Sequence, residues 1–422
     1  MSSQTNSPSS AEPLDLSRWR SLPMWLMIGG AAAVGIGFLV DHDAVTQFAF
    51  SWLLAFMFFL TIALGGLGFT ILHHLFDAGW SVTIRRIMEQ MAYTLRWAWL
   101  GWIPLFLFRA RLYQWVREIQ AGHPDLATKA KLPLFTQPGF VITSLICVGI
   151  WWWLSTQLRG WSLKQDETGS VECTRMMRRY SAFGVFLFGL SLTMAAILWV
   201  KALEHEWYST MYGVYIFAGS MWTAVATIYV ITLVLDRQGP LKGLVHHKTY
   251  YFIGSILFAF TVFYAYVTFA QYFITWNANI PEEGFWYVQR TTGTWWWVCM
   301  IIIFGHFFVP FLGLLRIDVK LKYWFMVPLV MWIWLMQFVD MSFNIVPVLH
   351  KGGYHLDVMD LGCMALIGGF VARSFLKQLF AHPIAPQRDP RFAESQEIYV
   401  PADEYVEAAT ARGINHKGGG GH

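Results

Sequence analysis

The chain has 422 residues, of which 56% are hydrophobic and only 13% are charged, and its mean hydropathy is +0.44. A soluble globular domain carries about twice that share of charged residues, so the composition excludes an ordinary soluble enzyme. The net charge of +4 comes from arginines and lysines in the loops, and it gives no support to nucleic-acid binding.

Apolar runs long enough to cross a bilayer recur along nearly the whole chain. Lipid cannot satisfy backbone amides, so each run is expected to be a helix. We therefore predict an all-α membrane protein with ten transmembrane helices, in which spans two to five and six to nine form two four-helix groups. The ten predicted spans are residues 22–40, 48–72, 87–108, 140–158, 182–200, 212–235, 252–276, 295–315, 323–346 and 361–380.

Polar segments flank the predicted transmembrane domain, residues 22–380. Residues 1–21 are Ser/Pro-rich and lack a signal-peptide pattern, which predicts a flexible cytoplasmic tail. Residues 381–422, which end in HKGGGGH, are predicted to be a polar cytoplasmic tail. Twenty arginines and lysines fall on the side of the termini and eight on the other, so the positive-inside rule places both termini in the cytoplasm.

The third loop is the exception to this charge rule, because it holds five of the eight outer cations. Its segment RARLYQWVREIQ spaces Leu112, Trp115 and Ile119 as on one face of a helix, with arginines on the other. This pattern predicts an amphipathic helix lying in the membrane interface, where arginines extend toward water without setting the topology.

Two ionisable residues lie deep within predicted spans. His306 is near the middle of the eighth span, and Asp340 is in the outer half of the ninth. Such residues are expensive in lipid and are functional candidates by default. An imidazole can relay a proton and a buried carboxyl can accept and release one, so both are predicted members of a proton path. For His306 the alternatives are binding of a quinone oxygen, ligation of a metal, or a structural hydrogen bond to a neighbouring helix.

The densest group of charges is HHLFDAGWSVTIRRIMEQMAYTLRWAW, residues 73–99. It is typical of a wet, charge-paired entrance to a proton path, or of a cytoplasmic turn whose arginines follow the positive-inside rule. Glu89 and Arg96 are seven residues apart and are expected to share a helix face. The proton-path candidates in this stretch are His73, His74, Asp77, Arg85, Arg86, Glu89 and Arg96.

The loops on the opposite side are the most polar and aromatic. The segment KALEHEWYSTMYG, residues 201–213, is expected to shape an outer pocket or proton exit, or to be exposed charge at the interface. Polar residues of the seventh span, Tyr264 among them, are expected to line a water wire or to join helices. The candidates for a quinone-binding or outer pocket are Glu204, His205, Tyr212 and Asp360.

Motifs that hold cofactors or catalyse reactions do not occur in the sequence. The four cysteines form no C-x-x-C pair, and the chain has no P-loop, G-x-S-x-G or H-E-x-x-H motif. We therefore predict no catalytic residue, no metal ligand and no redox cofactor on this chain. If electrons are involved, their carriers are expected on partner chains.

Three stretches resemble one known family. EWYSTMYGVYIFAG (206–219), QYFITWNANIPEEGFWYVQR (271–290) and HHLFDAGWSVTIRRIMEQ (73–90) are similar to the ActF-type integral-membrane subunit of bacterial alternative complex III. This complex is a quinol:electron-acceptor oxidoreductase, and its membrane subunits are related to the polysulfide-reductase membrane-subunit family. The resemblance covers about residues 20 to 380. It implies ten spans, arranged as two four-helix bundles with peripheral first and last helices, in the bacterial cytoplasmic membrane.

The resemblance also implies partners in a respiratory or photosynthetic electron-transfer complex. These are a sister quinol-binding membrane subunit, an iron–sulfur subunit and multihaem cytochrome c subunits, which carry the haem c and iron–sulfur clusters. Quinone binding by this chain itself is implied by similarity alone. The turn at 271–290 is then expected to be a docking surface for the peripheral redox subunits. Its predicted docking residues are Trp276, Asn277, Asn279, Pro281, Glu282, Glu283, Trp286, Tyr287 and Arg290.

Two other functions stay open on the sequence. A proton-coupled secondary transporter would show Gly/Pro-interrupted spans in corresponding positions of two halves, whereas Pro310 and Pro328 lie inside spans without forming such a pair. A scaffold without any site would need no mid-membrane ionisable residue. The sequence favours a complex subunit that supplies a proton path and a docking surface.

Overall fold

The computed structural model describes residues 17–41 and 43–395, and within these ranges it contains helices and no strand. Nine helical segments of the described chain are long and apolar enough to cross a membrane. The protein is therefore an all-α, multi-pass membrane protein, as the sequence predicts. The nine segments are α1 (Ser17–Val40), α2 (Ala44–Leu75), α8 (Gln137–Thr168), α9 (Val171–Ala195) with η3 (Ala196–Val200) and η4 (Lys201–Glu204), α10 (Tyr212–Arg237), α11 (His247–Ala278), α13 (Trp295–Ile301) with η5 (Ile302–Phe308) and α14 (Val309–Leu314), α16 (Tyr323–Ile345), and α17 (Val358–Phe380).

The third predicted span, residues 87–108, is not one helix. It is formed by α3 (Arg85–Tyr93), η2 (Thr94–Trp97) and α4 (Ala98–Leu107) in succession. At the break, the Thr94 hydroxyl donates to the carbonyl of Met91 at 2.7 Å, and such bonds compete with the regular helical ladder. The tighter 3₁₀ turn that follows interrupts the helix.

This break changes the surroundings of Arg96. The sequence predicts that Glu89 and Arg96 share a helix face, but the helix ends at Tyr93 before it reaches Arg96. The Arg96 guanidinium instead lies over the rings of Tyr93 and Trp97, 4.3 and 5.0 Å from their centroids. Cation–π contacts therefore hold this arginine.

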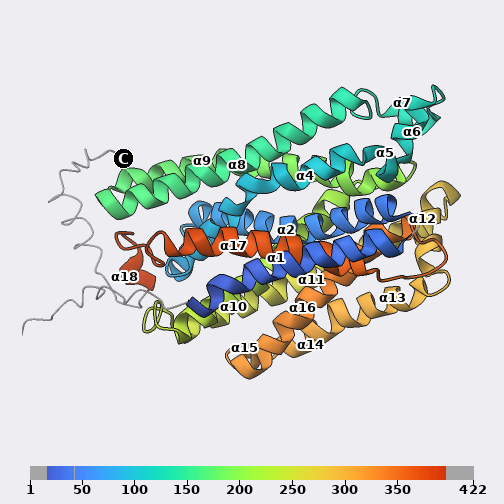
Figure 1. The fold of residues 1–422 in the computed structure, drawn as a ribbon. Helices are drawn as coiled ribbons and strands as arrows, with labels where there is room; N and C mark the ends of the chain where they lie inside the picture. Colours follow the sequence, from blue (N-terminus) through green and yellow to red (C-terminus); the bar gives the residue numbers. More distant parts are fainter. Residues whose placement is uncertain (1–16, 42, 396–422) are drawn as a thin grey trace, which may run out of the picture.

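The helices form two packed groups and a peripheral pair (Figure 1). The first group contains α2, α3, α4, α8 and α9, and the second contains α10, α11, α13, α14 and α16. Helices α1 and α17 pack along each other and against α2, outside both groups. The peripheral α1 and α17 agree with the arrangement that the resemblance implies, but the two groups are not separate bundles, because α2 packs against α10 at least as closely as against α9. Where α2 meets α10 the backbones are close, because a Cβ on Gly65 would lie 2.2 Å from the Ser220 carbonyl oxygen.

Alternate loops collect at opposite ends of the molecule (Figure 1). We call the end where α1 begins and α17 finishes the tail end; it lies at the left of the figure. The opposite end, which holds α6, α7 and α12, is called the loop end. Short helices in the connections are η1 (Gly79–Ser81), α5 (Arg109–Leu112), α6 (Gln114–Gln120), α7 (Leu126–Ala130), α12 (Pro281–Thr291), α15 (Ile317–Lys320), η6 (Val346–Val348) and α18 (Phe392–Ser395).

The third loop packs on protein rather than in the membrane interface. Leu112 and Trp115, predicted to face lipid, are each only 2% exposed. Trp115 stacks on Phe135 at 5.0 Å between ring centroids and contacts Phe140 near the start of α8. The predicted single helix is broken, because α5 ends at Leu112 and α6 begins at Gln114 after an extended Tyr113. The apolar side chains are covered by the chain's own aromatic residues.

The terminal segments lie only partly within the described residues. Of the predicted tails, residues 1–16 and 396–422 fall outside them, and α1 already begins at Ser17. Residues 381–395 belong to the predicted C-terminal tail, and they pack on the tail end of the bundle, where Asp389 is buried. This packing places the Asp389 carboxylate against the buried guanidinium of Arg85.

Candidate functional site

A buried carboxylate forms the centre of the candidate site. Asp340 of α16 is 1% exposed. Its Oδ1 accepts hydrogen bonds from the hydroxyls of Tyr215 on α10 and Tyr264 on α11, at 2.5 and 2.6 Å. In the described part of the chain, Oδ2 has no hydrogen-bond partner and no cation pairs with the group. Because no ion pair fixes its charge, this carboxyl can change protonation state without breaking one.

His306, which Tyr264 links to this carboxylate, lies in a wide π-helical turn, η5. Its imidazole is sandwiched between Trp222 and Tyr264, with ring centroids 3.9 and 3.8 Å away. Gln337 interacts with the imidazole, but the contact falls short of a hydrogen bond. Both ring nitrogens and both amide atoms of Gln337 therefore lack a hydrogen-bond partner among the described residues. Unpaired buried polar atoms are costly and point to a functional constraint.

Polar side chains continue from Asp340 along one face of α16. Gln337, Asp340 and Asn344 have the i, i+3, i+7 spacing that places them on the same side of a helix. The Asn344 amide donates to the Tyr215 hydroxyl at 2.7 Å, and the Tyr212 hydroxyl donates to the Asn344 side-chain oxygen at 2.9 Å. The hydrogen-bonded groups thus extend from the helix centre toward the loop end.

Arg290 of α12 carries this chain of contacts to the loop end. Its guanidinium donates to the carbonyls of Phe343 and Asn344, at 2.9 and 3.1 Å. It also forms an ion pair with Glu204, 2.8 Å away, whose side chain is 12% exposed. The contacts therefore run from the middle of the helices almost to the surface. We call this set the Asp340 polar chain: His306, Gln337, Asp340, Tyr264, Tyr215, Asn344, Tyr212, Arg290 and Glu204.

The predicted docking residues divide into two sets. Trp286 and Arg290 are buried, and the Arg290 guanidinium lies 3.8 Å from the Trp286 ring. They anchor α12 to the core, so they do not belong to an exposed docking surface. The sequence predicts that a charged residue in this turn lies at the surface, whereas the Arg290 guanidinium donates to buried backbone carbonyls. The remaining docking candidates are exposed or half-buried: Trp276, Asn277, Asn279, Pro281, Glu282, Glu283 and Tyr287.

The predicted outer-pocket residues also separate. Tyr212 and Glu204 join the Asp340 polar chain, whereas His205 contacts Asp125 and Glu118 of the third loop. Asp360 has a structural role, because one oxygen accepts from the Ser51 hydroxyl at 2.6 Å and the other from the backbone at the start of α17. It completes a capping box there. The structure does not gather these four candidates into one pocket.

At the tail end, buried charges form a balanced group. Arg85 pairs with Glu89 at 3.1 Å and with Asp389, and Arg86 pairs with Glu89 at 3.1 Å and with Asp166. Burial alone would raise the pKa of Asp389, but Arg85 and the neighbouring Arg391 outweigh it and lower that pKa below its ordinary value. Together with Arg391, three arginines face three carboxylates. We call these six residues the tail-end ionic cluster, and its fixed pairs fit a structural lock better than a site of proton exchange.

The two adjacent histidines of α2 lie near this cluster. The His73 Nδ1 is hydrogen-bonded with the Ser81 hydroxyl at 2.6 Å, and the rings of His73 and His74 meet edge to face at 4.9 Å. Both ring nitrogens of His74 lack a hydrogen-bond partner within residues 17–41 and 43–395. Asp77 is partly exposed and pairs with Arg391 at 2.9 Å. The structure thus brings the proton-path candidates of residues 73–89 together at the tail end. Arg96 lies apart from them, against the rings of Tyr93 and Trp97.

Sequence reasoning missed several members of these groups. Asn344 and Gln337 share a helix face with Asp340, so helical spacing was a usable signal for both. No such signal marks Asp389 or Asp166, because each meets an arginine about eighty or more residues away in the chain. Only the tertiary fold pairs them.

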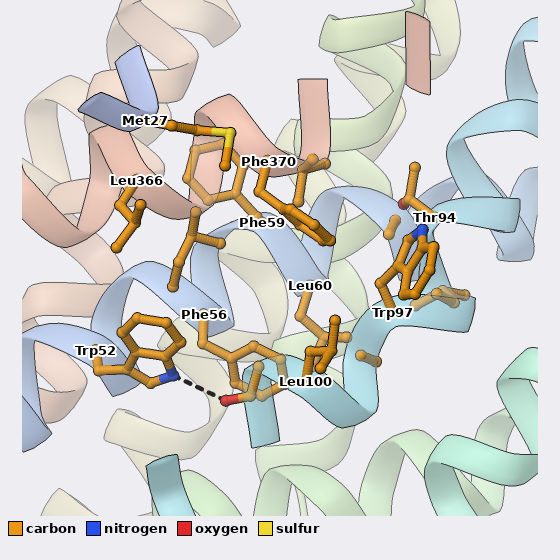
Figure 2. Close-up of a pocket in the computed structure, with 16 residues that line it drawn as sticks. Met27, Trp52, Phe56, Phe59, Leu60, Thr94, Trp97, Leu100, Leu366 and Phe370 are labelled. Carbon is orange, nitrogen blue, oxygen red and sulfur yellow. Dashed lines mark hydrogen bonds between the residues drawn. The ribbon is translucent and has the colours of Figure 1, made fainter. Parts of the chain in front are cut away.

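An apolar groove opens between α1, α2, α4 and α17 (Figure 2). It encloses about 240 Å³, and Phe56, Phe59, Leu366 and Phe370 line it. A polar lining group, the Trp52 indole N–H, already donates to the Gly101 carbonyl at 2.8 Å. The groove therefore suits a hydrocarbon chain better than a head group that needs hydrogen bonds.

Fold and site together define a class of protein. The chain is a multi-pass α-helical membrane protein in which a polar chain links a mid-helix carboxyl and imidazole to one end of the bundle. No known protein-family model matches the chain, and no curated protein matches it in sequence.

Proposed function

We propose that this chain conducts protons along the Asp340 polar chain, as the integral-membrane subunit of a quinol-oxidising electron-transfer complex of the alternative complex III type. The observation that carries the proton path is the buried Asp340 carboxylate, which receives two tyrosine hydrogen bonds and no counter-cation among the described residues. A buried carboxyl that no ion pair holds in its charged form is able to take up and release a proton.

The neighbouring groups suit transfer of protons over a distance. The hydroxyls of Tyr212 and Tyr215 can both donate and accept hydrogen bonds, and both connect to Asn344. Glu204 lies near the surface at the loop end, where its ion pair with Arg290 ends this set of contacts. Arg290 stays positively charged under all ordinary conditions, so it would hold the exit groups in place without exchanging protons itself.

The place in a complex is supported by the three motifs that resemble the ActF-type subunit and by the exposed residues of α12 and the turn before it. In this proposal the partner subunits are a sister quinol-binding membrane chain, an iron–sulfur chain and multihaem cytochromes c, and they carry the haem c and iron–sulfur clusters. The present chain supplies no catalytic residue. The positive-inside rule supports both termini in the cytoplasm, and the resemblance to the ActF-type subunit supports a place in the bacterial cytoplasmic membrane.

Quinone chemistry is assigned in this proposal to the sister subunit. A quinone head group needs hydrogen-bond donors, and the groove lined by Phe59 and Phe370 is almost entirely apolar. The groove fits an isoprenoid tail or a lipid acyl chain. This chain would therefore contact the tail of a bound quinone and leave the head group to another subunit.

A proton-coupled secondary transporter is the alternative, because the third segment is interrupted at η2 and irregular turns occur at η3 and η5. In such carriers the interruptions occupy corresponding positions of two repeats. Here η2 is in the second segment of the first group, and its counterpart α11 is described as one continuous helix. The interruption at η2 is thus not paired between the groups, which favours the complex subunit.

Purification through a tag on this chain in mild detergent tests the proposal. Haem absorbance bands and several co-purifying subunits are expected in mass analysis. A colourless chain that stays folded alone would favour the carrier and refute the complex. In the intact complex reconstituted into vesicles, Asp340→Asn is expected to reduce proton movement per electron transferred. Asp318→Asn, an exposed carboxylate at the tail end, is the matched control, and equal behaviour of both variants would refute the path.

A further inference from the structure

One imidazole and two carboxylates meet at the loop end. His205 follows η4, Glu118 lies on α6, and Asp125 directly precedes α7. The His205 Nε2 is 3.0 Å from the Asp125 Oδ2 and 3.5 Å from the Glu118 Oε2. All three ligand atoms lie within 4.8 Å of one another. Nitrogen and oxygen donors therefore converge on one point from segments about eighty residues apart.

These side chains are held in place by contacts outside the cluster. The second Asp125 oxygen caps α7 by accepting the Thr128 backbone N–H at 2.6 Å. The Thr128 hydroxyl donates to Glu118 at 3.3 Å. His205 is 2% exposed, and the Lys131 ammonium donates to its backbone carbonyl. Such supporting contacts orient metal ligands in known sites.

We propose that Glu118, Asp125 and His205 form a binding site for a divalent transition metal, with Zn²⁺ as the best fit. Zinc bound tetrahedrally at about 2.0–2.2 Å holds its donor atoms about 3.4 Å apart, and the two distances from the imidazole lie on either side of this value. One imidazole with two carboxylates is a donor set that suits zinc. Calcium and magnesium prefer six or more oxygens.

An ion pair between a protonated His205 and the two carboxylates is the competing explanation of the same geometry. With a neutral imidazole, the two carboxylates would repel each other across the cluster, and a divalent cation would neutralise them.

A bound metal would tie the third loop to the segment that leads into α10. Asp125 and Glu118 are partly exposed, with side chains 28% and 19% accessible, so a water molecule or a group from another subunit can reach the fourth coordination position. The sequence predicts no metal ligand because it contains no C-x-x-C pair and no H-E-x-x-H motif. Ligands from three separate segments leave no such spacing.

The test uses the full chain, purified in mild detergent and treated with chelator, in a background with His416→Ala and His422→Ala so that the C-terminal histidines do not contribute. We expect one Zn²⁺ per chain by elemental analysis and a higher melting temperature with zinc. Co²⁺ is expected to give the visible absorbance of tetrahedral coordination.

Paired variants separate a metal site from an ion pair. Asp125→Asn keeps an N-cap for α7, because asparagine caps as well as aspartate. Combined with Glu118→Gln, it should weaken zinc binding by at least about tenfold, given that removal of even supporting groups costs ten- to a hundredfold. Glu206→Gln, the exposed neighbouring carboxylate, should bind zinc as the parent does. Parent-like zinc affinity in the double variant, or no zinc on the parent chain, would overturn the proposal.

Discussion

The phenol ring of Tyr264 lies flat against the imidazole of His306, with the two ring centroids 3.8 Å apart. Its hydroxyl donates to Asp340 at 2.6 Å. A single side chain thus touches both ionisable groups in the middle of the helices. Trp222 covers the other face of the imidazole, so His306 can neither turn nor move away without disturbing Tyr264. The arrangement predicts that Tyr264 couples the two groups.

Tyr264→Phe would keep the stacked ring and remove only the hydroxyl. Tyr215 would then be the one tyrosine still donating to Asp340. A hydrogen bond to a charged group contributes about 1.5–3 kcal/mol, and each 1.4 kcal/mol of barrier is about tenfold in rate. We expect proton movement in vesicles to slow by about tenfold, measured with a pH-sensitive dye.

Tyr250→Phe is the matched control for this variant. The Tyr250 hydroxyl also donates to a carboxylate, Asp236, at 3.0 Å, but it lies at the tail end outside the Asp340 polar chain. Its removal should leave the rate unchanged. If both variants slow proton movement equally, or neither does, the coupling role of Tyr264 is wrong.

Arg290→Gln is expected to destabilise the protein strongly. The Arg290 side chain is fully buried and pairs with Glu204 at 2.8 Å while donating to three backbone carbonyls. Breaking a buried pair by removing one partner costs about 3–5 kcal/mol. Thermal unfolding in detergent should therefore show a large fall in melting temperature.

Arg175→Gln provides the comparison for Arg290. Arg175 pairs with Glu172 at 2.7 Å, but both side chains are more than half exposed. Exposed pairs contribute little, so the melting temperature should barely change. If Arg290→Gln melts at the same temperature as the parent, the placement of the Arg290 side chain in the core is wrong, and the residue lies at the surface as the sequence predicts.

Much of the fold, and the depth of the key groups, could be predicted from the sequence. Apolar length identified the spans, and an ionisable residue inside a span singled out Asp340 and His306. The partners could not be predicted in the same way, because Tyr215 and Tyr264 come from other helices and only packing brings them to the carboxylate. Arg290 was assigned to the surface because a sequence does not show which way a charged side chain in a turn points.

Asp389→Asn is expected to weaken the tail end of the bundle. Asp389 is buried and pairs with Arg85, and it also pairs with Arg391 at 3.3 Å. The substitution would leave Arg85 with fewer acceptors in a buried position, which costs about 3 kcal/mol. Hydrogen exchange should rise in α3 and in residues 381–395. Glu172→Gln removes a carboxylate from an exposed pair, and it should leave hydrogen exchange unchanged. Equal exchange in the two variants would show that the Asp389 pairs do not stabilise the tail end.

The lowered pKa of Asp389 predicts that the stability of the protein depends on pH. The folded-state pKa of this carboxylate lies below the ordinary value of 3.8, because the effect of the neighbouring arginines exceeds the cost of burial. A group with a lowered pKa stabilises the fold above its unfolded-state pKa and loses this contribution as the pH falls through the folded-state pKa. The melting-temperature gap between the parent and Asp389→Asn should stay constant from pH 7 to about pH 4 and close below it. A gap that closes near neutral pH would show that another group is responsible.

The close contact of α2 with α10 gives the last prediction. A Cβ at Gly65 would lie 2.2 Å from the Ser220 carbonyl oxygen, so Gly65→Ala must push the two helices apart. Helix α10 carries Tyr212 and Tyr215, and the shift should misalign both hydroxyls. Overpacking costs about 1–3 kcal/mol, and we expect a lower melting temperature together with slower proton movement. Gly149→Ala, on an open face of α8 with no neighbour within 4 Å, should be neutral or stabilising because alanine favours helix. If Gly65→Ala keeps the parent's melting temperature and rate of proton movement, then α2 and α10 are not as closely packed at Gly65 as the structure shows. The positions of Tyr212 and Tyr215 would then not depend on this contact.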